Sequence, residues 1–163
     1  FSEVRSNIRR MGALLQRQAQ AEALVAEFDA RLAEARAPKG APGPRLALYY
    51  ANSYTSGVGT LADEVVGAAG FENIAEELGF EGTLKLPLET LVLAKPDVVV
   101  GKERGRRSPG RAYENYAHPA LRLAADRALM SSVADKNWIC GGPFTAEAGR
   151  LLSAARDAAP TAP

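Results

Sequence analysis

The sequence contains a single histidine, His118, and a single cysteine, Cys140. One histidine excludes a metal site built from several imidazoles, and a serine–histidine–aspartate triad would depend wholly on it. Because His118 directly precedes Pro119 at an expected helix start, helix capping or a surface role is favoured over catalysis. One cysteine cannot form an intrachain disulfide, and we expect Cys140 to be a small buried side chain. We therefore expect no catalytic residue and no metal ligand.

Long hydrophobic runs and an excess of charge are also lacking. The apolar runs are far shorter than the roughly 20 residues needed to cross a bilayer, so we predict no membrane span. The 20 lysines and arginines nearly balance the 19 aspartates and glutamates, which suggests no nucleic acid partner. The first residues show no secretory signal, and the sequence starts close to or inside a helix, as a fragment or a processed product would. With 163 residues, 47% of them apolar, we expect one globular domain.

The N-terminal part predicts one long helix. Apolar residues recur there at steps of three, four or their multiples, at Val4, Ile8, Met11, Leu15, Leu24, Phe28 and Leu32. A helix over 3–35 would be about 50 Å long, at about 1.5 Å per residue, and would reach beyond a small domain. Gly12 costs about 1 kcal/mol relative to alanine there and indicates a close packing contact. We thus expect a long helix in 1–37, a proline- and glycine-rich linker in 38–44 and an α/β lobe in 45–163.

Strand and helix signals alternate over the rest of the chain. The short apolar run at 45–51 predicts a buried strand, and the continuous apolar run at 97–101 is typical of a central parallel strand that is covered on both faces. Thr60 and Asp63 resemble a capping box at the start of a helix. Helices are expected at 61–69, 87–95, 119–127 and 144–155, and short extended segments at 83–86, 131–134 and 137–140. The fold class is therefore α/β, with a single Rossmann-like three-layer lobe and a mostly parallel sheet after the long helix.

Two loops follow predicted strands, at the end where open α/β sheets usually bind ligands. The loop at 53–60, SYTSGVGT, has the placement of an anion-binding loop, but it matches neither the P-loop nor the dinucleotide fingerprint. The loop after 97–101 holds Glu103 among five cations, Lys102, Arg104, Arg106, Arg107 and Arg111. These cations form either a wall for an anionic ligand or a solvated surface loop.

Three motifs resemble the C-terminal half of class III periplasmic binding proteins, the family that serves importers of ferric siderophores, haem and cobalamin. They are the Thr-Ser-Gly loop that leads into a helix, AAGFENIA at 68–75 and LETLVLAKPDVVV at 88–100. The last is the most specific, because a glutamate followed by a helix ending in Lys-Pro-Asp and an apolar strand recurs in each lobe of such proteins. The resemblance covers essentially the whole chain, while the family's N-terminal lobe has no counterpart in it.

The resemblance implies a non-enzymatic binding lobe. In the family, two α/β lobes are joined by a long interlobe helix, which 1–37 resembles, and the ligand lies in the cleft between them. The implied ligand is a small metal chelate, namely a ferric siderophore, haem or a corrinoid, with anionic chelates favoured by the basic loop. The implied partners are the missing N-terminal lobe and an ABC permease, with no nucleic acid and no other cofactor. The implied location is the periplasm or an anchored position at the cell surface.

The resemblance also assigns roles to individual residues. Tyr54, next to Thr55, matches an aromatic residue that lines the cleft, and Asn137 and Trp138 match a loop that faces it. For Trp138, core packing is an equal alternative. The expected ligand contacts are Tyr54, Thr55, Lys102, Arg104, Arg106, Asn137 and Trp138.

Glu89 matches the acidic residue that, in the family, docks onto arginines of the permease. It is also an ordinary first-turn residue that the helix dipole would stabilise by about 0.3–1 kcal/mol. Two other functions stay open. One is a nucleotide-binding α/β enzyme that uses the 53–60 loop for phosphate, and the other is a structural or sensory module.

Overall fold

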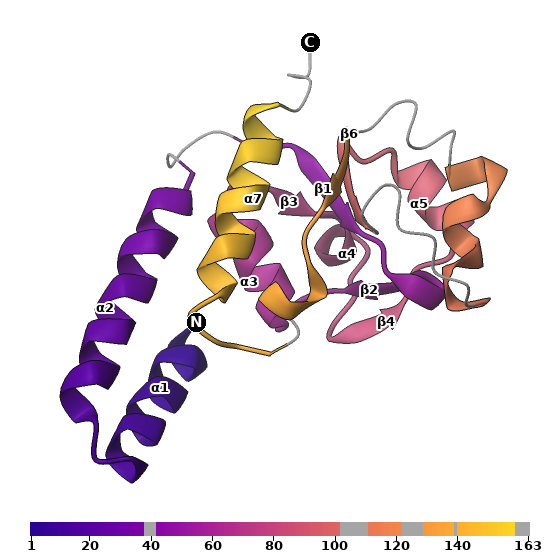
Figure 1. Ribbon diagram of the computed structural model, residues 1–163. Coiled ribbons are helices and arrows are strands. Elements are labelled where there is room, and N and C mark those ends of the chain that lie inside the picture. Colours follow the sequence, from indigo (N-terminus) through magenta and orange to yellow (C-terminus); the bar gives the residue numbers. More distant parts are fainter. Residues whose placement is uncertain (38–41, 102–110, 122–128, 139, 159–163) are drawn as a thin grey trace.

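A helical hairpin followed by an α/β lobe makes up the described part of the computed structural model, which comprises residues 1–37, 42–101, 111–121, 129–138 and 140–158 (Figure 1). The hairpin consists of α1 (Ser2–Leu14) and α2 (Gln18–Ala35). Within these residues, no helix is both long and apolar enough to cross a membrane. The lobe has the α/β class that the sequence predicts.

A four-stranded parallel sheet forms the centre of the lobe, in the order β3-β1-β5-β6. Its strands are β1 (Arg45–Leu48), β3 (Glu72–Asn73), β5 (Val98–Gly101) and β6 (Leu129–Ser132). At most 1% of the surface is exposed in Leu46, Ala47, Leu48, Val98, Val99 and Val100. β1 and β5 are the two central strands, so the buried strand expected at 45–51 is confirmed over 45–48, and the covered parallel strand expected at 97–101 is confirmed as β5.

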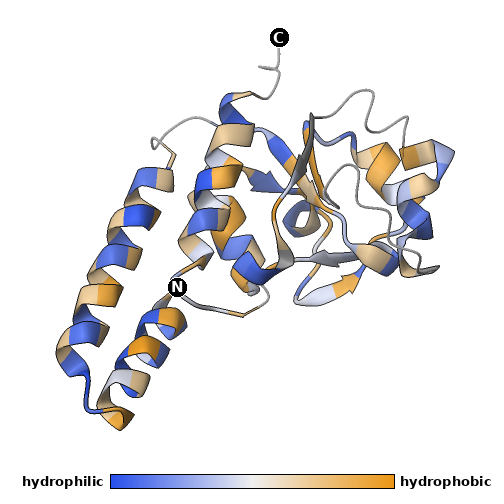
Figure 2. Ribbon diagram, in the orientation of Figure 1, coloured by the Kyte–Doolittle hydropathy of each residue, from blue (hydrophilic) through white to orange (hydrophobic). Residues whose placement is uncertain are grey.

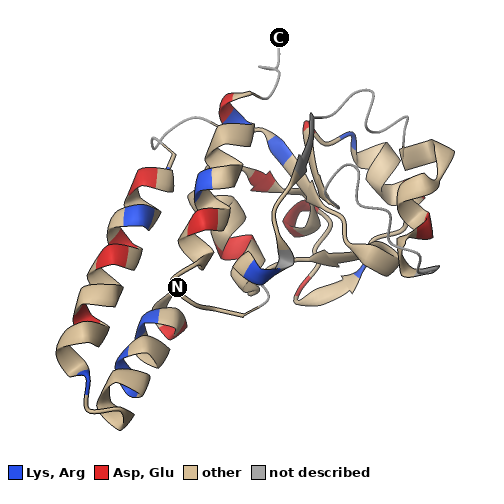
Figure 3. Cartoon of the chain, viewed as in Figure 1, with Lys and Arg blue, Asp and Glu red and all other residues tan. Residues whose placement is uncertain are grey.

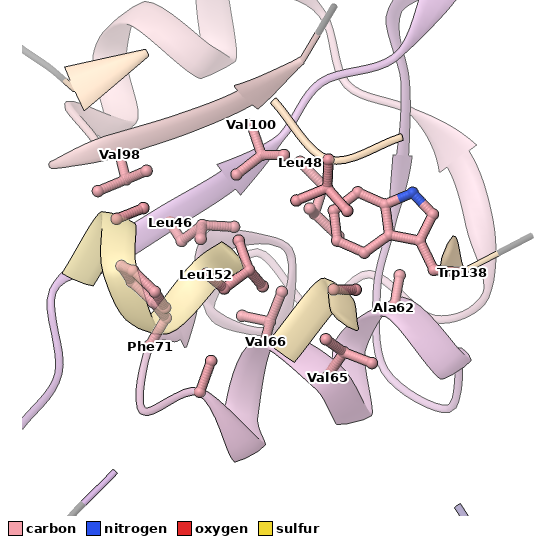
Figure 4. Packing of buried hydrophobic residues seen from close by; sticks show 14 residues of the cluster. Leu46, Leu48, Ala62, Val65, Val66, Phe71, Val98, Val100, Trp138 and Leu152 are labelled. Carbon is pink, nitrogen blue, oxygen red and sulfur yellow. The ribbon is translucent and has the colours of Figure 1, made fainter. Parts of the chain in front are cut away.

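Helices cover both faces of this sheet. They are α3 (Leu61–Ala68), α4 (Ile74–Glu77), α5 (Leu88–Ala94) and α7 (Thr145–Asp157). Successive strand residues point to opposite faces, so Leu46 and Val98 pack with α3 and α7 (Figure 4), whereas Ala47 and Val99 pack with α4 and α5. Each fully buried leucine or valine of these strands contributes about 1.5–3 kcal/mol, and together the buried side chains hold the three layers in place.

A small antiparallel sheet lies beside the main one. Its strands are β2 (Tyr54–Ser56) and β4 (Thr83–Lys85), and the short helix η1 (Ala51–Ser53) leads into β2. The extended segment expected at 83–86 is confirmed. The sequence assigned 54–56 to a loop, which is wrong, because pairing with a distant strand extends these residues.

The segment after β6 also differs from the expectation. Residues 137–140 were expected to be extended, but Asn137 ends the short helix η3 (Asp135–Asn137), where its N–H donates to the carbonyl of Ala134 at 2.8 Å. Cys140 is exposed rather than buried, since it lies outside the core in a bend next to Gly141 and Gly142. The last helix, α7, is confirmed within two residues at its C-terminal end. Most of the helix expected at 119–127 lies outside the described residues.

The single long helix expected over 3–35 is wrong, because the chain reverses at 15–17 and α2 packs back against α1. Gln16 has a φ of 54°, in the left-handed region that non-glycine residues rarely adopt. Charged residues occur along both helices (Figure 3), and the ion pairs Arg5–Asp29 and Arg9–Glu22 join the two helices at 2.7 and 2.8 Å. That residues 1–37 join two lobes stays a prediction.

The apolar pattern explains the reversal. Leu24 follows Leu15 by nine positions, so in one continuous helix, at about 3.6 residues per turn, it would face the opposite side. In the hairpin Leu24 is 37% exposed, and α2 instead buries Ala21, Val25, Phe28, Leu32 and Ala35, at steps of four and three. These side chains pack toward α1 and α7, and hydrophobic residues recur between hydrophilic ones along the hairpin (Figure 2).

Gly12 permits the close approach of the two hairpin helices. A Cβ atom at Gly12 would lie 2.3 Å from the Cβ of Ala21, so an added methyl group would force α1 and α2 apart. We therefore expect Gly12→Ala to lower the free energy of unfolding by about 1–3 kcal/mol, measured by urea denaturation.

Gly67 in α3 is the matched control, because a Cβ atom there meets nothing within 4 Å. Gly67→Ala should raise the free energy of unfolding by about 0.5–1 kcal/mol through helix propensity alone. Equal effects of the two substitutions would contradict the close contact at Gly12.

Candidate ligand-binding edge

The carboxyl ends of the parallel strands define one edge of the lobe, which we call the carboxyl edge. It comprises the segment after β1 (49–56), the short helix η2 (Arg111–Ala117) and the segment after β6 (133–138). Asn115 Nδ2 donates to the carbonyl of Tyr50 at 3.0 Å, and the Tyr116 hydroxyl donates to that of Tyr49 at 2.6 Å. Open α/β sheets bind ligands at this end of their strands, so it is the candidate site.

Aromatic side chains gather at the carboxyl edge. All 5 tyrosines and the 1 tryptophan of the chain are there, at Tyr49, Tyr50, Tyr54, Tyr113, Tyr116 and Trp138. The rings of Tyr49 and Tyr116 meet edge to face at 6.1 Å, as do those of Tyr50 and Trp138 at 6.2 Å. The rings of Tyr113 and Tyr116 are stacked at 6.3 Å. Such ring contacts hold side chains in defined positions. Tyr49 and Trp138 are buried in the core, Tyr50, Tyr113 and Tyr116 are partly exposed, and Tyr54 is exposed, so four of the six rings reach the surface of this edge.

Tyr54 is the most accessible of these aromatic residues, with 40% of its surface exposed. Just before it, Asn52 and Ser53 have φ angles of 55° and 62°, and this left-handed turn directs the chain from η1 into β2. The Ser53 hydroxyl shares a hydrogen bond with that of Tyr49 at 2.9 Å, and the Ser53 carbonyl accepts one from the N–H of Leu86 at 2.8 Å. A left-handed backbone conformation costs about 1–2 kcal/mol per residue, and the hydrogen bonds of Ser53 help to stabilise this turn.

Three of the predicted ligand contacts are buried. Thr55 is fully buried, and within the described residues its hydroxyl has no hydrogen-bond partner. Asn137 is 4% exposed and Trp138 is 6% exposed. Trp138 packs in the core with Ala62 near β1 (Figure 4), so core packing accounts for it fully. As ligand contacts these three residues stay predictions, and among the predicted contacts that the structure describes only Tyr54 is exposed.

Of the five cations of the predicted wall, Lys102, Arg104, Arg106 and Arg107 lie outside the described residues. Their role as ligand contacts therefore stays a prediction. His118 has the capping role that its position predicts, because its Nδ1 accepts a hydrogen bond from the N–H of Ala120 at 3.2 Å. Within the described residues, no group of three or more histidine, cysteine, aspartate and glutamate side chains could hold a metal ion.

Three backbone amides of the 53–60 loop, those of Gly57, Val58 and Thr60, are already paired within the protein. The N–H groups of Gly57 and Val58 donate to the carbonyls of Gly82 and Phe80, at 2.8 and 2.9 Å. The N–H of Thr60 donates to the carbonyl of Gly57, and the Thr60 hydroxyl accepts from the N–H of Asp63 at 3.1 Å. A phosphate site needs such amides unpaired, so the loop's geometry opposes the nucleotide-binding alternative. The predicted helix cap at Thr60 is confirmed.

Glu89 lies in the first turn of α5 and is exposed. The opposite side of α5 anchors the helix through Leu91, which is fully buried, while Leu93 is 78% exposed. No ion pair among the described residues involves Glu89. The carboxylate is therefore available to a partner, although its docking role stays a prediction.

The opposite, amino edge of the sheet is held by ion pairs. The guanidinium of Arg45 donates to both Glu77 oxygens, at 2.9 and 2.6 Å, and the N–H of Arg45 donates to Asp97 at 2.8 Å. The hydrogen bond to Arg45 lowers the pKa of Glu77 and raises the pKa of the guanidinium. These groups satisfy one another, so this edge serves stability rather than binding.

Comparisons with known proteins agree with this arrangement. The family model described as "Periplasmic binding protein" matches residues 1–122. The heme-binding protein RhuT of Roseiflexus sp. RS-1 is similar with a TM-score of 0.75 and 24% identity, over 93% of this chain and 62% of that one. A heme-binding protein of Pseudomonas aeruginosa is similar with a TM-score of 0.71 and 24% identity, over 98% of this chain and 61% of that one.

An Fe3+-hydroxamate transport protein of Saccharomonospora viridis is also similar, with a TM-score of 0.70 and 21% identity, over 94% of this chain and 55% of that one. A search of curated proteins found no significant match. The chain thus spans between 55% and 62% of the length of these three solved structures.

Thr55 at the carboxyl edge and Thr60 at the start of α3 should respond oppositely to the same substitution. Thr55→Val removes a buried hydroxyl without a partner, so we expect the free energy of unfolding to stay equal or to rise by up to about 2 kcal/mol. Thr60→Val removes a helix cap and should lower it by about 1 kcal/mol. Chemical denaturation measures both, and a loss at Thr55→Val as large as at Thr60→Val would contradict the assignment of Thr55.

Proposed function

The chain belongs to the periplasmic binding protein family, and on that premise we propose that it is one lobe of the solute-binding component of an ABC importer. In this role it captures an iron chelate and presents it to a membrane permease, without catalysing a reaction. The lobe acts in the periplasm or anchored at the outer surface of the cell. The observation that carries the proposal is the set of aromatic side chains at the carboxyl edge, with Tyr54 exposed among them.

Haem and anionic ferric siderophores rank above a corrinoid as the ligand. Flat aromatic side chains suit a planar or ring-bearing chelate, since ring stacking adds about 0.5–1.5 kcal/mol beyond simple burial. The names of two of the similar structures, both heme-binding proteins, support this order. The cations Lys102, Arg104 and Arg106 would favour an anionic chelate if they face the carboxyl edge.

A second lobe completes the pocket in this proposal. The similar structures are longer than this chain, which covers 62% of the Roseiflexus protein, and the remaining part would supply the opposite wall. The hairpin of α1 and α2 would then lie between the two lobes. Ligand pockets usually bury 70–90% of the ligand surface, so one wall by itself should bind weakly.

The first test of the proposal measures binding by the 163-residue chain. Haemin titration followed by absorbance should give an affinity at least about tenfold weaker than that of the Pseudomonas aeruginosa heme-binding protein under the same conditions. Saturable but weak binding is the expected result. Binding as tight as that of the control protein would contradict the two-walled pocket.

The second test concerns permease docking by Glu89. In the complete protein, we expect Glu89→Arg to reduce uptake of the chelate by about tenfold while the affinity for the chelate stays unchanged, because charge pairs at such an interface mainly govern docking. Glu76→Arg is the matched control, since Glu76 is also exposed in the first turn of a short helix. Equal uptake by the two variants would overturn the docking role, as would loss of chelate affinity in the Glu89 variant alone.

A further inference from the structure

An exposed lysine stands beside the accessible tyrosine of the carboxyl edge. We propose that Lys85 binds a carboxylate of the ligand and that Tyr54 contacts the ligand next to that carboxylate. This inference rests on the proposed function and adds a ligand contact on β4, a strand to which the sequence assigned no ligand contact. It concerns an iron chelate that carries carboxylates, whether a porphyrin or a carboxylate siderophore.

The strand register places the two side chains together. Tyr54 pairs with Lys85 in the antiparallel β2–β4 ladder, so both side chains point to the same face of the small sheet. The Lys85 ammonium lies 6.0 Å from the centre of the Tyr54 ring. Both side chains are exposed, whereas the next ladder pair, Thr55 and Leu84, faces the other way, toward the interior.

Lys85 retains hydrogen-bonding capacity for a ligand. Among the described residues no carboxylate forms an ion pair with it, and its contact with the Tyr54 ring is electrostatic and uses no hydrogen bond acceptor. In the described part of the chain, the cations that pair with acids are Arg5, Arg9, Arg31, Arg45, Arg150, Arg156 and the N-terminus. An ammonium has three N–H donors, so Lys85 can bind a carboxylate while it stays against the ring.

The backbone around the pair is fixed on both strands. The N–H of Tyr50 donates to the carbonyl of Tyr54 at 2.7 Å, and the N–H of Leu86 donates to that of Ser53 at 2.8 Å. The Leu86 side chain is fully buried in the cluster with Leu91, which anchors β4 immediately after Lys85. Because the backbone of both strands is already ordered, a ligand that binds to this pair incurs only a small entropic cost for ordering the protein.

The neighbouring groups favour a carboxylate over a phosphate. A phosphate site would draw on backbone amides, but those of Gly57, Val58 and Thr60 already donate to carbonyl groups of the protein. A single ammonium next to an aromatic ring suits a carboxylate at the edge of a ring-bearing ligand, and such charge-assisted hydrogen bonds are about twice as strong as neutral ones. The pair can therefore distinguish acidic chelates from neutral ones.

The test uses the 163-residue chain and diamagnetic gallium(III) protoporphyrin IX, which has two propionates. Backbone amide NMR titration measures even weak affinity. Lys85→Met should weaken binding of the diacid about three- to tenfold, as expected for one partly exposed charged contact. It should leave binding of the porphyrin dimethyl ester unchanged, and Lys85→Arg should retain most of the affinity for the diacid.

Lys95→Met is the matched control, because it removes the same charge from an exposed lysine after α5, near Arg45 at the amino edge. Equal effects of Lys85→Met and Lys95→Met on the diacid would overturn the inference but leave the proposed function intact. No amide shift with the diacid in the unmodified chain would overturn both.

Gallium(III) citrate distinguishes the two sources of the carboxylate. Shifts of the Tyr54 and Lys85 amides with citrate as well as with the porphyrin would support a contact for carboxylate chelates in general. Shifts with the porphyrin alone would support a porphyrin propionate as the partner. Shifts with either probe that leave both of these amides unchanged would overturn the inference.

Discussion

The burial of β1 and β5 between two layers of helices is the constraint on which the rest of the lobe depends. Leu46 and Ala47 are successive residues of β1, and their side chains pack into hydrophobic clusters on opposite faces of the sheet. The same short strand therefore anchors both helical layers. Parallel strands must end at a common edge, and the chain that leaves β1 there has to turn sharply. That turn, at Asn52 and Ser53, sets the position of Tyr54. The core thus determines where the lobe can meet a ligand.

The two edges of the sheet have different roles: the contacts of the amino edge stabilise the fold, and the carboxyl edge is the candidate binding site. At the amino edge, Arg45, Glu77 and Asp97 satisfy one another, and little polar capacity is left for a ligand. At the carboxyl edge, aromatic side chains are held in place while Tyr54 and Lys85 stay exposed. This division fits a lobe that binds a chelate at one end of its strands, as we propose for this member of the periplasmic binding protein family.

Local patterns in the sequence predicted the layers of the lobe but not its long-range contacts. The apolar runs at 45–48 and 98–100 and the cap at Thr60 are short-range signals, and the structure agrees with them. Strand β2 was missed because only pairing with β4 makes it extended. The half-turn offset between Leu15 and Leu24 was a signal for the hairpin, and the long-helix prediction overlooked it. Lys85 has no motif of its own, and only the register with Tyr54 brings it to the candidate site.

The most direct measurement of the central claim is hydrogen–deuterium exchange of the chain with and without haemin. If the carboxyl edge binds the chelate, amide exchange should slow in 49–56 and in 111–117, where the aromatic side chains are concentrated. Exchange in 72–77 at the amino edge should stay the same. Slowing that is centred on 72–77 or on the α1–α2 hairpin, or no slowing at saturating haemin, would contradict the account.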